Sequence, residues 1–144
     1  MYSENDHKNL KNLALIFGIV YIIVSIVGII CLFTNAVNLI LIDPIEQVIQ
    51  ILIGVIFLRG YINFNKKNYS GEAFLFVGTI IGIVLGILSF LDLLFGGLFG
   101  GLITESSLNN FIKRIVSYSL KPALILGFLT FIPHKIIKQR EMIQ

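Results

Sequence analysis

Four ionisable side chains stand in or next to long apolar stretches of the chain: Glu46, Arg59, Asp92 and Lys121. Charged groups are costly inside a bilayer, so those that occur there often pair with one another or serve the pathway of an ion or solute. The alternative is that each side chain reaches headgroups or water from a helix end, with Glu46 also favoured by the N-terminus of its own helix. These residues are the first candidates for chemistry.

A more specific hypothesis is that several polar residues form one cluster on the outer, non-cytoplasmic side of a membrane. Asp92 is expected to pair with Lys121 or Arg114. Two glutamines that lie three residues apart share one face of a predicted helix, and this polar face should point into a helix bundle. Together these groups would line a vestibule for an ion or a small polar solute. The predicted cluster consists of Asp92, Lys121, Glu46, Gln47, Gln50 and Arg114.

No catalytic pattern is complete in the sequence. No serine or threonine has a histidine or lysine at a local spacing that would activate it, and there is no phosphate-binding loop, zinc spacing or dinucleotide fingerprint. Cys31 is the single cysteine, so neither a disulfide nor a thiol metal site is expected. His7 and His134 lie near opposite chain ends. We therefore expect no enzyme, no cofactor and no metal.

The composition indicates that a lipid bilayer is the solvent of this chain. Of its 144 residues, 56% are hydrophobic and 13% are charged, whereas a soluble domain has about 25% charged residues. The net charge of +3 is explained by basic residues that orient a membrane protein, so no nucleic-acid partner is expected. A chain of this length has room for one compact bundle, and we expect a single membrane domain over residues 1–144.

Apolar stretches of sufficient length predict an all-α integral membrane protein that forms a four-span transmembrane helix bundle, because about 20 residues cross the roughly 30 Å hydrocarbon layer. The second span begins at Asp43 and Pro44, an N-cap followed by proline. Lys121 and Pro122 interrupt the fourth. Residues 96–114 include a glycine-rich apolar tract that permits helical, re-entrant or interfacial structure. The predicted spans are residues 13–33, 44–64, 73–95 and 115–132.

Two of the predicted spans carry a glycine-rich packing face. Small residues recur every four residues in the third span and at alternating steps of four and three in the first. Such faces let helix backbones approach closely. They are expected to pack either within the chain's own bundle or against another chain, and the pattern does not choose between these partners. The residues concerned are Gly78, Gly82 and Gly86 in the third span, and Gly18, Ser25 and Gly28 in the first.

The distribution of lysine and arginine predicts the orientation. These residues are more frequent in the two chain ends and in the connection around residues 66–67 than on the opposite side. Positively charged connections stay in the cytoplasm, so both termini are expected there. The protein is expected in the cell (plasma) membrane.

The leading functional interpretation is a structural or accessory protein that acts through helix packing, as a homo-oligomer or as a small subunit of a larger membrane complex. It is favoured by the short connections, the glycine-rich faces and the lack of a complete site. The alternative is a small channel or transporter for an ion or polar solute, favoured by the predicted polar cluster. A third, weaker interpretation is that the basic cytoplasmic segments bind anionic lipid.

Overall fold

The computed structural model describes residues 4–34, 43–66, 70–99, 102, 108–119 and 121–130, and the regular elements in these ranges are all helical. This confirms the all-α prediction. In chain order the elements are α1 (Glu4–Thr34), α2 (Pro44–Asn65), α3 (Ser70–Asp92), the π-helix η1 (Leu93–Phe99), α5 (Leu108–Ser119) and α6 (Pro122–Leu129).

Three helices in the described ranges are long and apolar enough to cross a membrane: Lys8–Thr34, Pro44–Asn65 and Ser70–Phe99. They coincide with the first three predicted spans. The start of α2 follows the expected chemistry, because the Asp43 carboxylate accepts a hydrogen bond of 2.8 Å from the Ile45 backbone N–H and Pro44 occupies the first turn. An acidic cap also suits the positive end of the helix dipole.

The predicted fourth span over residues 115–132 is not a continuous helix. α5 ends at Ser119 and α6 begins at Pro122. Proline lacks a backbone N–H and disfavours a helical conformation in the residue before it, and Lys121 accordingly has an extended backbone. α5 has 12 residues and α6 has 8, so each is too short to span a bilayer alone. The count of four spans is not confirmed, and residues 131–132 lie outside the described ranges.

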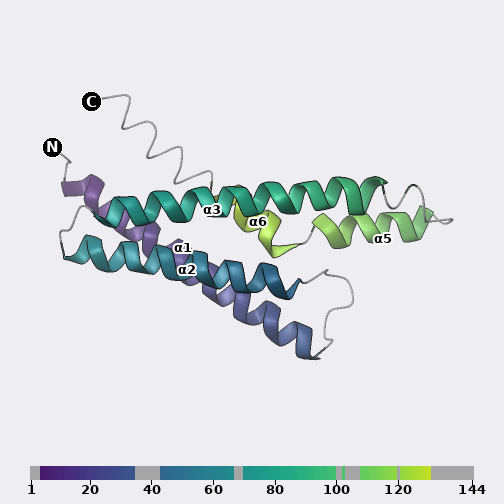
Figure 1. Cartoon of the computed structure of the whole chain (residues 1–144), viewed down its shortest axis with the longest axis horizontal. Coiled ribbons are helices and arrows are strands. Elements are labelled where there is room, and N and C mark those ends of the chain that lie inside the picture. The colour runs from purple at the N-terminus through teal and green to yellow at the C-terminus, as the bar shows by residue number, and fades with distance from the viewer. Residues whose placement is uncertain are drawn as a thin grey trace, which may run out of the picture.

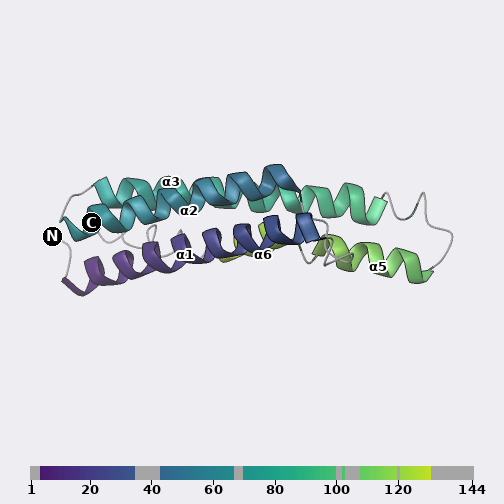
Figure 2. The same cartoon turned by 90° about the horizontal axis from the view of Figure 1, so that it is seen from below.

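The segment predicted to be helical, re-entrant or interfacial, residues 96–114, is helical where the structure describes it as an element. The π-helix η1 continues α3 to Phe99, and α5 covers the last part of the segment. Residues 100–101 and 103–107 lie outside the described ranges. η1 and α5 pack together and extend beyond the ends of α1 and α2 (Figure 1 and Figure 2).

In the bundle α1 packs along α2 and α2 along α3, while α6 packs against α3, from which η1 and α5 separate it in sequence (Figure 1). Its apolar core includes fully buried Tyr21, Ile53, Phe57 and Leu75. The Phe57 ring of α2 is central, because its centroid lies 5.7 Å from that of Phe17 and 6.0 Å from that of Tyr21, both on α1. Contacts between aromatic rings, stacked for Tyr21 and tilted for Phe17, therefore join the first two helices.

Both glycine-rich faces contact other helices of the same chain. On α3, Gly78 faces the Phe57 ring, Gly82 faces Tyr21 and Thr130, and Gly86 faces Gly127 of α6. The small face of α1 meets α2, as described for Ser25 and Gly28 below, and Gly18 packs against Leu58. The glycines thus allow close approach within the bundle itself.

The contact between Gly86 and Gly127 generates a stability prediction. A Cβ added to Gly86 would lie 2.7 Å from Gly127 Cα, a backbone atom that cannot move aside alone. We expect Gly86→Ala to destabilise the fold by about 1–3 kcal/mol through overpacking, measured by thermal unfolding in detergent with circular dichroism. The matched control is Gly78→Ala, whose Cβ would lie 3.2 Å from the Phe57 ring, a side chain that can shift. Equal effects would contradict the prediction.

Candidate functional site

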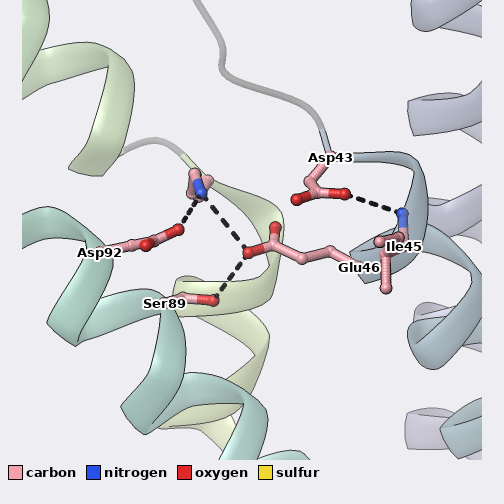
Figure 3. Close-up of polar contacts among 6 residues, drawn as sticks. Asp43, Ile45, Glu46, Ser89 and Asp92 are labelled. Carbon is pink, nitrogen blue, oxygen red and sulfur yellow. Dashed lines mark hydrogen bonds and ion pairs between the residues drawn. The ribbon is translucent and has the colours of Figure 1, made fainter. Parts of the chain in front are cut away.

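Four polar side chains from three elements meet where α2 begins, and we call Glu46, Ser89, Asp92 and Lys121 the charge cluster. The Lys121 ammonium donates to Asp92 Oδ2 at 2.8 Å and to Glu46 Oε1 at 3.5 Å. Ser89 Oγ also donates to Glu46 Oε1, at 3.4 Å. Figure 3 shows the carboxylates of Glu46 and Asp92 facing each other across this cluster. One ammonium therefore bridges two carboxylates from different helices.

Local sequence positions each member of the charge cluster. Glu46 lies in the first turn of α2, directly after the Asp43 cap. Ser89 and Asp92 lie three residues apart at the end of α3, so they share one face. Lys121 occupies the non-helical step before Pro122, where the break between α5 and α6 lets its side chain reach α3 and α2. Pro122 thus positions the Lys121 ammonium next to Glu46 and Asp92.

Burial differs sharply within the charge cluster. The side chain of Lys121 is 6% exposed and that of Glu46 is 13% exposed, whereas that of Asp92 is 59% exposed. Asp92 therefore forms the accessible rim, and Glu46 lies deeper. The Lys121 ammonium also lies 5.4 Å from the centre of the Tyr118 ring, which adds a cation–π contact. Two carboxylates and one ammonium give the cluster a formal charge of −1.

A second set of polar side chains continues into the bundle between α1 and α2, and we call Gln47, Gln50, Ser25 and Tyr21 the polar column. All four are fully buried. The Gln47 amide lies directly against Gly28, and Ser25 Oγ lies 3.4 Å from Gln50 Oε1 and donates to the Tyr21 carbonyl at 2.7 Å. The column ends where the Tyr21 ring stacks on Phe57.

Several buried polar atoms at this site have no hydrogen-bond partner among the described residues. They are Tyr21 Oη, Glu46 Oε2, both amide atoms of Gln47, and Gln50 Nε2. An unsatisfied buried donor or acceptor costs about 1–3 kcal/mol, so such groups are rare unless a ligand or water completes them. The arrangement can bind a small species that both donates and accepts hydrogen bonds.

The structure brings together only part of the predicted cluster. Asp92 pairs with Lys121, and Glu46 joins them. The two glutamines point toward α1 and belong to the polar column instead, because residue 47 is rotated by about 100° from residue 46 around a helix. Arg114 lies in α5, and its side chain is outside the described part of the structure.

Sequence reasoning missed two contributors, Ser89 and Tyr21. Ser89 carried a usable signal, because it precedes Asp92 by three residues and so lies on the same helical face. Tyr21 lies within the small-residue seam of α1 but reaches across to Gly82 of α3, which only the tertiary arrangement reveals. Within the described ranges, no group of three or more His, Cys, Asp or Glu side chains is placed to hold a metal ion.

Comparison with known protein families identifies the class. A family described as the MJ0565 integral membrane domain matches residues 4–139. The chain belongs to this family. No curated protein and no solved structure matches the chain. Membership of an integral membrane domain family, together with three apolar helices of spanning length, confirms that the protein is a membrane protein that lies in the lipid bilayer.

A bilayer environment explains the apolar exterior of this family member. Large side chains on the outward face of α1, such as Ile16, Ile23 and Ile30, are about half exposed. The corresponding face of α3 exposes Val84 and Leu88. Polar side chains are instead gathered inside the bundle, which is the distribution expected when lipid surrounds the protein.

Removal of the Lys121 ammonium tests the charge cluster. We expect Lys121→Met to destabilise the fold by about 3 kcal/mol, because the largely buried Glu46 carboxylate loses its cation. The double variant Glu46→Gln with Lys121→Met should recover much of this loss. Asp92→Asn should cost less, since that carboxylate is mostly exposed.

The measurement is thermal unfolding of each purified variant in the same detergent. Lys113→Met is the matched control, because Lys113 is an exposed lysine of α5. If Lys121→Met were no more destabilising than Lys113→Met, or if Glu46→Gln gave no recovery, the charge cluster would not contribute to stability as described.

Proposed function

We propose that the protein is a small channel or transporter that admits an ion or a small polar solute through the charge cluster. We call this side the outer side, following the orientation predicted from the basic residues, which stays a prediction. The observation that carries the proposal is that an accessible carboxylate, Asp92, lies at the same end of the bundle as buried polar atoms that lack partners, on Glu46, Gln47 and Gln50. Polar groups at membrane depth are costly and are usually retained for a pathway.

The electrostatics of the entrance favour cations. The charge cluster has a formal charge of −1. A carboxylate-lined entrance raises the local concentration of cations. Glu46 Oε2 lies behind Asp92 as a further acceptor. These features support a cation, or a solute with a positive group, over an anion.

Aromatic side chains follow the polar column toward the other end of the bundle. The Phe57 ring stacks on that of Tyr21 and contacts that of Phe17, and Phe64 is buried further along α2. Passage through the bundle would therefore require the aromatic rings to move, and in our proposal access is from the charge cluster alone. A one-sided state of this kind is typical of transporters that alternate access between the two sides.

The packing of the glycine-rich faces helps to choose between an accessory subunit and a transporter. The accessory-subunit interpretation drew on these faces as surfaces for another chain. In the described residues they are occupied by the chain's own helices. The polar cluster, which motivated transport, instead meets buried polar atoms without partners. For this reason we favour transport over the accessory-subunit interpretation.

Flux through proteoliposomes tests the proposed function. The full chain is reconstituted with encapsulated dyes for protons and for Na⁺ or K⁺. We expect flux above that of empty liposomes, and a decrease of about tenfold in Asp92→Asn, because loss of one carboxylate at the entrance is worth roughly 1.4 kcal/mol. Lys121→Met, which removes the positive charge of the cluster, should raise cation flux instead.

The matched control for flux is Asp43→Asn. This change also removes a carboxylate from the outer end of α2, but asparagine retains the helix cap and Asp43 lies outside the charge cluster. Its flux should remain near that of the unmodified protein. Unchanged flux in both Asp92→Asn and Lys121→Met, or equal loss in all three variants, would remove the basis of the proposal.

A second candidate function, an accessory subunit, is favoured by the apolar surface of η1 and α5. These elements extend beyond α1 and α2 (Figure 2), yet Phe95, Phe99, Leu108 and Ile112 are at least half exposed. An exposed apolar patch at such a place suits contact with another membrane subunit, a second copy or the lipid surface.

Gentle extraction of the tagged protein, followed by light scattering and identification of each band, tests the second candidate. A partner that co-purifies in fixed ratio, and is lost on Ile112→Glu but kept on Lys113→Glu, would support an accessory role through α5. Lys113 is the exposed neighbour on the polar side of α5 and serves as the matched control. Purification of the protein alone as a monomer would argue against the accessory role.

A further inference from the structure

We propose that the polar column is a hydrated half-channel, in which ordered water molecules bind Gln47 and Gln50 between the charge cluster and Tyr21. The inference rests on the proposed function for its biological role and deepens it by defining what can pass. The site consists of residues that are fully buried in the membrane-spanning part of the bundle. Its ligand is water, and its solute class is limited to protons and other species of about the size of a water molecule.

The unsatisfied amides carry the inference. Both polar atoms of the Gln47 amide and Nε2 of Gln50 have no hydrogen-bond partner among the described residues, although neither side chain has any exposed surface. The side-chain amide has a donor nitrogen and an acceptor oxygen. Because both atoms of the Gln47 amide lack partners, the conclusion is the same if the amide is turned so that N and O exchange positions. Buried groups of this kind are normally completed by ordered water.

The mixture of donors and acceptors distinguishes water from other ligands. Gln47 Oε1 requires a donor, whereas the two Nε2 groups require acceptors. A bare cation would satisfy oxygen atoms only and would be repelled by the N–H groups. A water molecule donates and accepts, so a short chain of water molecules can complete all three atoms.

Close packing excludes a larger solute from the column. A Cβ added to Gly28 would lie 2.6 Å from Gln47 Cδ, and one added to Gly82 would lie 2.8 Å from both Tyr21 Oη and Thr130 Cγ2. The glycines therefore leave room for the polar side chains themselves and for little else. Sugars and amino acids therefore do not fit beside these side chains, and in our proposal only single water molecules occupy the column.

The column reaches about half of the way across the bilayer. From Glu46 to Phe57, α2 advances by roughly 16 Å at 1.5 Å per residue, against a hydrocarbon thickness of roughly 30 Å. Ser25 and Tyr21 continue the polar lining on the α1 side, and the Phe57 ring closes it. Water that enters past Asp92 and Glu46 therefore stops at the aromatic rings. Figure 3 shows the Glu46 and Asp92 carboxylates that form the entrance.

Water-edited solid-state NMR of the full chain in lipid bilayers tests hydration directly. In the ¹⁵N-labelled protein, magnetisation passes from water to nearby amide groups, and the rate of build-up reports water contact. The side-chain signals are assigned with Gln47→Met and Gln50→Met, each of which removes one signal. We expect the side-chain amides of both glutamines to build up several-fold faster than the backbone amide of Ile53, a fully buried apolar residue of the same helix.

A pair of glycine variants sharpens the test. Gly28→Ala would push its Cβ into the Gln47 amide and should slow the build-up at Gln47, whereas Gly18→Ala, on the same helix, contacts Leu58 and should leave it unchanged. Glutamine amides that build up as slowly as the backbone amide of Ile53 in the unmodified protein would overturn the inference.

The outcomes for hydration and for flux are distinguishable. If the glutamine amides are hydrated but the protein shows no flux, the half-channel inference stands and the proposed function is refuted. If the protein shows flux but the glutamine amides have no water contact, the half-channel inference is refuted and the proposed function stands. Flux of a solute as large as an amino acid would contradict the size limit stated above.

Discussion

The bridging of two carboxylates by the Lys121 ammonium is the interaction on which the half of the bundle around the charge cluster depends. It joins α6 to α3 through Asp92 and to α2 through Glu46, so three elements are held at one level. Glu46 and Lys121 are both largely buried, and leaving one of them unpaired is more costly than at a protein surface. The short helix α6, which cannot span the membrane alone, is held in part by this pairing.

Close helix packing and the placement of buried polar groups depend on the same small residues. Without a hydrophobic driving force between helices in lipid, small residues provide contact by letting backbones approach. Here the same small residues also create the space for polar side chains, with Gly28 against Gln47 and Gly82 against Tyr21. A larger residue at either glycine would displace a polar group. The glycine-rich faces therefore set the bundle geometry and the lining of its interior together.

The interior is asymmetric along the membrane normal. Toward the outer side, the described core contains charged, amide and hydroxyl groups. Beyond Phe57, the buried residues are apolar, including Phe64, Leu75 and Leu10. An apolar barrier stops hydrated species because no group replaces their lost hydrogen bonds. The bundle thus has a polar half around the charge cluster and an apolar half beyond Phe57.

The sequence alone was enough to identify helices, membrane insertion and the start of α2, because length, apolar composition and cap chemistry are local properties. It also located the break at Pro122, but it did not reveal that the break divides the predicted fourth span into two short helices. Only the tertiary structure decided that Asp92 pairs with Lys121, that Gln47 faces α1 and that Gly86 meets Gly127. These contacts join residues distant in sequence, and their partners depend on how the helices are rotated and staggered, which helical periodicity does not specify.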